Sequence, residues 1–166
     1  MVRPTSARVR TALFDMLAAF GLEGRTVLDL YAGNGTLGME ALQRGAQRCD
    51  FVECEPRLCS ALKASLEAAG LKESGQVLCM KVERALAQLK GPYDIVLMDP
   101  PYEMQGLKEV VERVGESGLI AEGGLLVVEH SKRVSLVESY GELRRWRSRR
   151  YGDTMIGMYV RGEATW

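Results

Sequence analysis

A short apolar run, a turn and then a stretch with apolar residues three or four positions apart recur along this chain. The runs are typical of strands and the wider spacing is typical of helices, so the repeat predicts successive βαβ units. Several runs are apolar throughout instead of alternating, which indicates strands covered on both faces, as in a parallel sheet. The predicted strands are Thr26 to Leu30, Asp50 to Cys54, Gln76 to Met80, Asp94 to Met98 and Leu125 to Glu129.

Two helices can be bounded from the sequence. One begins at Pro56, a residue favoured at the first helical position, and ends near Gly70, a typical helix-stopping residue. The other precedes the first strand, where Thr5 or Ser6 can cap it. Its apolar side chains recur at helical spacing, at Val9, Leu13, Met16, Leu17 and Phe20.

The last part of the chain has a different pattern. Residues 143–151 and 154–160 read as strands joined by the turn-forming pair Gly152-Asp153. We therefore expect an α/β fold, with a mostly parallel twisted sheet, helices on both faces and a C-terminal antiparallel hairpin. A length of 166 residues suits a single domain with its own core. We divide it into an N-terminal helix segment, residues 1–22, and a core, residues 23–166.

The first predicted strand ends in a glycine-rich loop. Gly33, Gly35 and Gly38 have the spacing of a dinucleotide-binding fingerprint, and glycine permits a tight turn with close backbone approach to a ligand. Glu53, after the second strand, is placed to accept both hydroxyls of a ribose. We therefore predict a nucleotide-cofactor site at this loop, with Asn34 in its turn.

Asp29, just before the loop, separates two classes of cofactor. Its carboxylate would repel the pyrophosphate of a nicotinamide dinucleotide, but it suits the cationic amino-acid end of S-adenosylmethionine. S-adenosylmethionine, with S-adenosylhomocysteine as its product, is therefore the predicted cofactor. A nicotinamide dehydrogenase stays an alternative because it fits the same glycine spacing, and Asp29 has the alternative role of a structural cap of the turn.

The fourth predicted strand leads into Asp99-Pro100-Pro101-Tyr102, where two prolines make the backbone rigid. This turn and the glycine loop should face one crevice, because both follow the carboxyl ends of strands. An aromatic amine is a poor nucleophile, so its hydrogens must be held to direct its lone pair. Asp99 and a backbone carbonyl of the turn can accept these hydrogens, and Tyr102 can stack on a base. The four residues are the predicted catalytic site, which acts by alignment.

These motifs resemble those of class I, Rossmann-like amino-methyltransferases that act on nucleic-acid bases. Further segments are similar to the bacterial small-subunit (16S) rRNA guanine-N2 methyltransferases. The resemblance implies methylation of a guanine N2 amine in ribosomal RNA or in a small-subunit assembly particle. Another flat amine, in adenine, cytosine or a protein glutamine, is an alternative substrate, and an inactive RNA-binding assembly factor is an alternative function. The matching segments are Arg3-Pro4-Thr5, Arg8-Val9-Arg10, Leu13-Phe14, residues 38–46 and Arg150-Tyr151-Gly152-Asp153-Thr154.

The resemblance also implies a contact to the adenine of the cofactor after the third strand. The family commonly has an acidic residue there, whereas this sequence reads Met80-Lys81-Val82-Glu83. We expect Val82 and Cys54 to pack on the two sides of the adenine ring.

Overall charge does not indicate a polyanionic partner, since 22 Lys and Arg residues balance 22 Asp and Glu residues. Any RNA contact must come from local clusters. The arginines around Trp146 and Tyr151 form such a cluster, although a solvated edge strand is the alternative reading. Because side chains alternate along a strand, alternate arginines there should project from one face, opposite Arg144 and Arg150. The predicted RNA-binding residues are Arg3, Arg8, Arg145, Arg147 and Arg149, the last three on that common face.

Metal and membrane sites are not expected. The four cysteines form no CxxC pair, and the chain has one histidine, His130, for which we predict a structural hydrogen bond. No signal peptide and no apolar stretch of about 18 residues is visible. We therefore expect a soluble protein of the cytoplasm.

Overall fold

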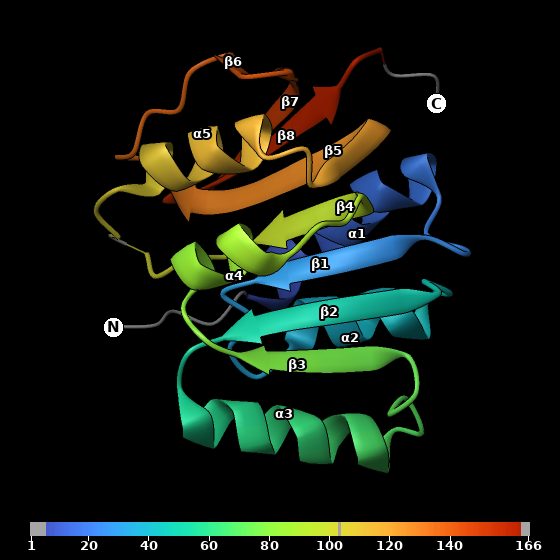
Figure 1. The fold of residues 1–166 in the computed structure, drawn as a ribbon. Helices are drawn as coiled ribbons and strands as arrows, with labels where there is room; N and C mark the ends of the chain where they lie inside the picture. Colours follow the sequence, from blue (N-terminus) through green and yellow to red (C-terminus); the bar gives the residue numbers. More distant parts are fainter. Residues whose placement is uncertain (1–5, 103, 164–166) are drawn as a thin grey trace.

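A computed structural model describes residues 6–102 and 104–163, and within them eight strands form one sheet in the order β3-β2-β1-β4-β5-β8-β7-β6 (Figure 1). Neighbouring strands from β3 to β5 are parallel, whereas β8, β7 and β6 are added in antiparallel pairs. The strands are β1 (Thr26–Leu30), β2 (Arg48–Glu53), β3 (Gly75–Cys79), β4 (Tyr93–Met98), β5 (Ile120–Ser131), β6 (Ser139–Tyr140), β7 (Leu143–Tyr151) and β8 (Thr154–Arg161).

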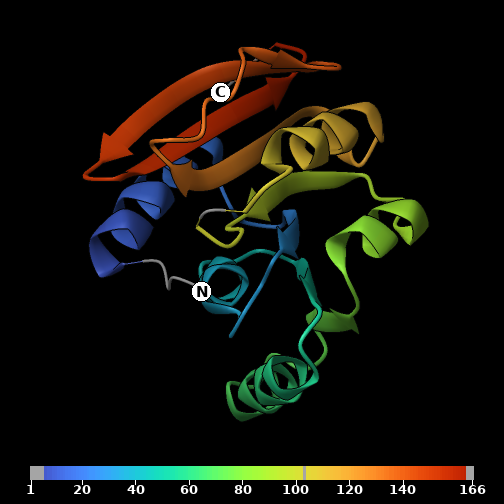
Figure 2. The ribbon, with the colours of Figure 1, turned by 90° about the vertical axis from the view of Figure 1, so that its left-hand side faces the viewer.

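Helices cover both faces of the sheet. One core contains apolar side chains of α1, α2 and α3, and the other contains those of α4 and α5. Figure 2 looks onto the carboxyl ends of the parallel strands and shows α1 and α2 on one side, with α4 and α5 on the other. The helices are α1 (Ala7–Phe20), α2 (Thr36–Gln43), α3 (Pro56–Ala68), α4 (Val82–Gln88) and α5 (Leu107–Glu116).

The predicted fold class is confirmed. Four of the five residues of β1 are buried, as expected for a central strand of a parallel sheet that is covered on both faces. Helix α3 begins at Pro56, and Gly70, just beyond its end, has a φ of +72°. Ser6 caps α1 by accepting a hydrogen bond of 3.2 Å from the Val9 N–H, and the alternative cap, Thr5, lies outside the described residues.

The C-terminal hairpin is also confirmed, but the predicted common face of its arginines is wrong. Arg145 lies opposite Tyr159 whereas Arg147 lies opposite Met158, so Trp146 is an extra residue that shifts the register. A β-bulge of this kind reverses the side-chain alternation beyond it. The face that packs toward α1 therefore carries Arg144, Arg147 and Arg149, and the opposite face carries Arg145 and Arg150.

Candidate active site

The predicted site residues come from three neighbouring strands. β2, β1 and β4 lie side by side, and their carboxyl ends carry Glu53, the glycine loop and Asp99. The charges of Asp99 and Glu53 both act on the buried carboxyl of Asp29. The topology thus brings three carboxyl groups of separate sequence segments to one edge of the sheet, as expected for an open α/β fold.

The glycine loop is held to β2 by the carboxylate of Glu53. One carboxylate oxygen accepts the N–H of Gly33 at 2.9 Å and the other accepts the N–H of Glu55 at 2.9 Å. A carboxylate oxygen can accept two hydrogen bonds, so each keeps capacity for a ligand hydroxyl. Gly33 has a φ of +60°, and a Cβ added there would meet no heavy atom within 4 Å. Its open side is available to a ligand.

Gly35 faces the protein, whereas Asn34 is exposed and bonds to a neighbouring residue of the turn. Gly35 has a φ of +80°, and a Cβ there would overlap the side chain of Leu62. The side-chain oxygen of Asn34 accepts the hydroxyl hydrogen of Thr36 at 2.7 Å, at the start of α2. Both residues therefore have a clear part in shaping the turn, and direct cofactor contact by either stays a prediction.

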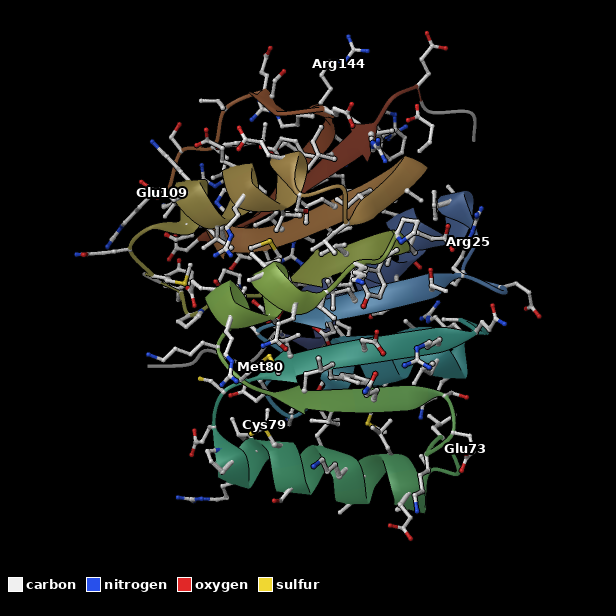
Figure 3. The ribbon with its side chains drawn as sticks, viewed as in Figure 1. Arg25, Glu73, Cys79, Met80, Glu109 and Arg144 are labelled. Carbon is white, nitrogen blue, oxygen red and sulfur yellow. The ribbon has the colours of Figure 1, made fainter. Side chains whose placement is uncertain are left out.

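A pocket of about 550 Å³, here called the Glu53 pocket, lies beside this loop. It brings together three of the predicted cofactor residues, Glu53, Cys54 and Val82. The other lining residues are not predicted from the sequence, although Met80, Lys81 and Glu83 belong to the segment after the third strand that is expected to contact the adenine. Figure 3 shows Met80 at the carboxyl end of β3, beside α4. The pocket is lined by Tyr31, Val52, Glu53, Cys54, Met80, Lys81, Val82 and Glu83.

Tyr31 is the most informative of the missed residues. Its φ of 60° is unusual for a residue with a side chain, and strain of this kind is concentrated at functional sites. Within the described parts of the chain, its hydroxyl is the buried side-chain polar atom that has no hydrogen-bond partner. A polar ligand group in the Glu53 pocket would give that hydroxyl a partner.

Asp29 lies beneath the loop and is 1% exposed. One carboxyl oxygen accepts the N–H of Gly38 at 3.0 Å, and a Cβ at Gly38 would lie only 2.9 Å from that oxygen. Burial raises the pKa of the Asp29 carboxyl to about 7; the Gly38 hydrogen bond opposes this effect, and the charges of Asp99 and Glu53 add to it. Asp29 thus has the structural role that the sequence left open, and its carboxyl ionises near neutral pH.

Asp29→Asn is expected to stabilise the protein at pH 8 and to have little effect at pH 4. The folded-state pKa of about 7 exceeds the ordinary value of 3.8, so the folded state binds the proton more tightly than the unfolded state. Stability from this group is therefore present at low pH and lost as pH rises from about 4 to about 7. At about 1.4 kcal/mol per pKa unit, the gain at pH 8 is on the order of 4 kcal/mol.

Urea unfolding of both proteins at pH 4, 6 and 8 measures this difference. Asp50 provides the control, because its buried carboxylate accepts the Tyr93 hydroxyl hydrogen at 2.6 Å and pairs with Arg48 at 3.1 Å. Asp50→Asn removes a charge that has donors and should lower the free energy of unfolding at pH 8. If Asp29→Asn stabilises the protein equally at all three pH values, the raised pKa of the Asp29 carboxyl is contradicted.

The Asp-Pro-Pro-Tyr turn borders a second, small hollow. Tyr102 donates its hydroxyl hydrogen to the carbonyl of Asp153 at 2.9 Å, which ties the turn to the end of the hairpin. The carbonyl of Pro101 accepts the N–H of Met104 at 3.0 Å. The half-buried turn is thus fixed from both sides. The hollow, here called the Asp99 hollow, is lined by Asp99, Pro100, Tyr102, Glu129, His130 and Thr154.

The predicted RNA-binding arginines do not form one cluster. The guanidinium of Arg8 lies 5.8 Å from the ring centroid of Tyr151, and that of Arg147 lies 4.3 Å from the ring centroid of Trp146. Arg145 is on the opposite face, where it donates to the carbonyl of Leu136 at 3.2 Å. Arg3 lies outside the described residues.

Residues 6–102 and 104–163 contain neither the side-chain grouping of a metal centre nor a helix suited to a membrane. No group of three or more His, Cys, Asp or Glu side chains is placed to hold a metal ion there. In the same residues, no helix has both the length and the apolar character needed to cross a membrane.

This chain has the fold of S-adenosylmethionine-dependent methyltransferases. Its parallel strands carry a pocket beside the loop after β1 and a rigid polar turn after β4. An RNA methyltransferase from Salinibacter ruber, solved with S-adenosylhomocysteine, has the same fold, with a TM-score of 0.72 over 97% of this chain and 95% of that one at 14% identity. A conserved hypothetical protein from Streptococcus pyogenes has a TM-score of 0.85 at 31% identity, over 93% of this chain and 96% of that one.

The chain belongs to the family described as "Conserved hypothetical protein 95", whose model matches residues 1–160. Among its relatives are proteins with functional names, and two of them cover most of this chain. The Bacillus subtilis protein named "Putative rRNA methyltransferase YlbH" is 35% identical over 160 residues, which cover 95% of this chain and 86% of that protein. Ribosomal RNA small subunit methyltransferase D from Escherichia coli is 35% identical over 129 residues, which cover 77% of this chain and 64% of that protein.

Proposed function

We propose that this chain, acting as a single domain, transfers a methyl group from S-adenosylmethionine to the exocyclic N2 amine of a guanine in small-subunit ribosomal RNA. The observation that carries the proposal is that the fixed Asp-Pro-Pro-Tyr turn lies at the same sheet edge as the Glu53 pocket. The names of the relatives support ribosomal RNA as the substrate. The guanine N2 atom is inferred from the sequence resemblance.

The Glu53 pocket fits the proposed cofactor. Glu53 would accept the ribose hydroxyls with the remaining lone pairs of its carboxylate, while Val82 and Cys54 would pack on the adenine. The unpartnered hydroxyl of Tyr31 and the carboxylate of Glu83 are candidates for polar contacts to the adenine. When bound, S-adenosylmethionine supplies an activated methyl group.

At the amino-acid end of the cofactor, Asp29 would hold the ammonium group through its charge. The carboxyl is poised for this role because its pKa is about 7, so a nearby cation favours loss of its proton. Gly33 would allow the backbone to approach the cofactor closely. Each of these residues binds or orients, and none needs to form a covalent bond.

The Asp-Pro-Pro-Tyr turn would align the guanine amine. Asp99 would accept one amine hydrogen, and the Pro100 carbonyl would accept the other, since the Pro101 carbonyl is already engaged by Met104. The anchored ring of Tyr102 would stack on the base. Alignment of the lone pair with the methyl donor is the main source of acceleration in this account.

Calorimetric titration with S-adenosylhomocysteine and with NAD⁺ tests the cofactor assignment. We expect S-adenosylhomocysteine to bind and NAD⁺ not to bind, because the pyrophosphate of NAD⁺ would meet the carboxylates near the loop. A nicotinamide enzyme would also leave the Asp-Pro-Pro-Tyr turn without a function. Any methyl transfer to RNA from labelled cofactor would exclude an inactive assembly factor.

For RNA binding, we propose that the hairpin face carrying Arg147 and Arg149 contacts the phosphate backbone. Replacing both with Ala is expected to weaken RNA binding and to reduce the log–log salt slope by about 1.4, at about 0.7 per lost contact to a single strand. Filter binding at several salt concentrations measures both quantities. The control is the double variant Lys63→Ala, Lys72→Ala, which also removes two positive charges. Lys63 lies on the exposed side of α3, and Lys72 lies just after the end of that helix.

Figure 3 shows why this pair is a suitable control: Glu73, next to Lys72, lies at the sheet edge opposite Arg144 of the hairpin. The control should leave the slope unchanged, and the dissociation constant for S-adenosylhomocysteine should stay the same in both variants. Equal slopes in the two double variants would assign the hairpin arginines to a solvated edge strand.

A further inference from the structure

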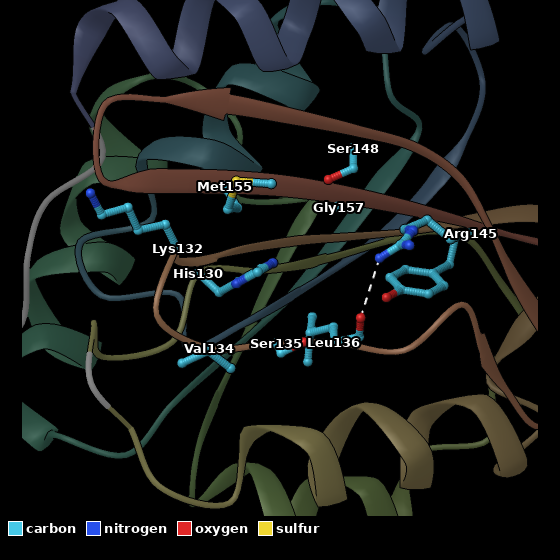
Figure 4. Close-up of a pocket in the computed structure, with 10 residues that line it drawn as sticks. His130, Lys132, Val134, Ser135, Leu136, Arg145, Ser148, Met155 and Gly157 are labelled. Carbon is cyan, nitrogen blue, oxygen red and sulfur yellow. Dashed lines mark hydrogen bonds between the residues drawn. The ribbon is translucent and has the colours of Figure 1, made fainter.

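A separate pocket of about 210 Å³ lies on the sheet face that carries Arg145. We call it the His130 pocket. Strands β5, β8 and β7 form its floor, and the 132–138 loop forms its outer wall (Figure 4). The lining residues are His130, Lys132, Val134, Ser135, Leu136, Arg145, Ser148, Met155, Gly157 and Tyr159.

The outer wall of the pocket is held in place by hydrogen bonds. Tyr159 donates its hydroxyl hydrogen to the carbonyl of Val137 at 2.8 Å, and the Val137 N–H donates to the hydroxyl of Tyr140 at 2.9 Å. Arg145 donates to the carbonyl of Leu136 at 3.2 Å, as Figure 4 shows. The loop is therefore fixed over the sheet by three side chains.

The floor stays open at Gly157. A Cβ added there would make only ordinary contacts, at 3.5 Å from the Cε1 of Tyr159 and 3.9 Å from the Nε2 of His130. The glycine is thus not required by local packing, since the protein has room for a methyl group. What the glycine provides is free space in front of the imidazole, which reaches toward the centre of the pocket in Figure 4.

His130 presents a hydrogen-bond acceptor to this space. Its Nδ1 lies 2.9 Å from the carbonyl of Ser131, and because a carbonyl only accepts, Nδ1 carries the ring hydrogen. Burial lowers the pKa of His130. The carbonyls of Ser131 and Val134 oppose this effect, whereas the positive charge of Arg145 adds to it. The ring is therefore neutral at neutral pH, and Nε2 is an acceptor.

The rest of the lining is amphipathic. Val134, Leu136 and Met155 supply apolar surface, whereas Arg145 and Lys132 supply positive charge. Both cations also have partners on the protein: Lys132 lies 3.0 Å from a carboxylate oxygen of Asp153, and Arg145 lies 3.8 Å from one of Glu138. This lining suits a flat heterocycle that carries a phosphate. The apolar walls would cover its faces, the acceptor would bind an N–H, and the cations would face the phosphate.

The pocket adjoins the candidate active site through His130, which lines both the His130 pocket and the Asp99 hollow. Lys132 and Tyr102, one from each site, both contact Asp153. The two sites therefore lie side by side on the protein.

We propose that the His130 pocket holds the base of a nucleotide that neighbours the methylated guanine in the RNA strand. This inference rests on the proposed function for its RNA substrate. The Nε2 of His130 accepts an N–H of the base, the apolar side chains cover its faces, and Arg145 and Lys132 face its phosphate. The pocket thereby fixes the register of the strand, so that the guanine reaches Asp99.

The single histidine of the chain makes a direct test simple, because its imidazole resonances in a proton NMR spectrum need no further assignment. The protein, saturated with S-adenosylhomocysteine to occupy the cofactor site, is titrated with AMP, GMP, CMP or UMP, and separately with inorganic phosphate. We expect a saturable shift of the His130 resonances with at least one nucleotide and none with phosphate. No shift with any nucleotide, or an equal shift with phosphate, would overturn the proposal.

Two variants and a matched control separate this pocket from the Asp99 hollow, which also contains His130. Gly157→Ala fills only the floor of the His130 pocket, so it should weaken the nucleotide that shifts His130 by at least several-fold. Arg145→Ala should also weaken it, whereas Arg150→Ala, on the same face but outside the lining, should not. Circular dichroism confirms that each variant is folded.

The outcome is independent of the outcome for the proposed function. One result is that nucleotides shift the His130 resonances, that Gly157→Ala abolishes these shifts, and that the protein transfers no methyl group to RNA. This result would support the pocket and contradict the methyltransferase assignment. Methyl transfer to RNA with unchanged affinity in Gly157→Ala would contradict the pocket and leave the assignment intact.

Discussion

Asp99→Ala is expected to reduce the rate of methyl transfer to RNA by a factor on the order of 10² or more, while the dissociation constant for S-adenosylhomocysteine stays within a few-fold of the original. The substitution removes an acceptor that aligns the amine but leaves the lining of the Glu53 pocket complete. Single-turnover kinetics with labelled cofactor, together with calorimetry, measure the two quantities separately.

Asp99→Asn serves as the graded control for this prediction. Its side-chain oxygen still accepts one hydrogen bond, so the rate should fall between those of the original protein and Asp99→Ala. A loss confined to KM, with kcat unchanged, would show uniform substrate binding instead of alignment. Unimpaired turnover in Asp99→Ala would remove the residue from the mechanism.

Gly33→Val is expected to weaken binding of S-adenosylhomocysteine by about 100-fold or more, equivalent to about 2.8 kcal/mol at 1.4 kcal/mol per tenfold change. The φ of Gly33 is +60°, which a β-branched residue adopts only with strain, and its side chain would occupy the open side of the loop. Calorimetric titration measures the loss directly.

Gly70→Val is a matched control for the strain. Gly70 has a φ of +72° and also has no heavy atom within 4 Å of an added Cβ, but it follows α3 and lies outside the glycine loop, in which the N–H of Gly33 donates to Glu53. It should lower the free energy of unfolding much as Gly33→Val does and leave cofactor affinity unchanged. Normal affinity in Gly33→Val would exclude this loop from the cofactor site. Gly35→Val is less informative, because it would also displace Leu62 from the core.

Those parts of the fold that depend on local chemistry could be predicted from the sequence. The largely apolar run of residues 26–30 predicted the bounds of β1 correctly, and Pro56 marked the start of α3. The Gly152-Asp153 pair located the hairpin turn between β7 and β8. For His130 the predicted structural hydrogen bond is confirmed by its contact with the Ser131 carbonyl.

Features that depend on tertiary packing could not be predicted. Simple alternation misassigned the arginines of β7, because nothing in that segment indicates that Trp146 is accommodated as an extra residue. The depth at which Asp29 is buried follows from its contact with Gly38, nine residues away, and from the packing of α2 on the sheet. Likewise, Glu83 enters the Glu53 pocket because α4 begins at Val82, beside β2 and β3.

Methylation of a guanine N2 amine in ribosomal RNA is tested by incubation of the protein with labelled S-adenosylmethionine and hypomethylated small ribosomal subunits, followed by digestion of the RNA to nucleosides. We expect the label to be recovered as N2-methylguanosine, and Asp99→Ala to yield little of it under the same conditions. Label recovered in a methylated adenosine, a methylated cytidine or a ribosomal protein would contradict the proposed substrate, and absence of label from every fraction would contradict the proposed activity.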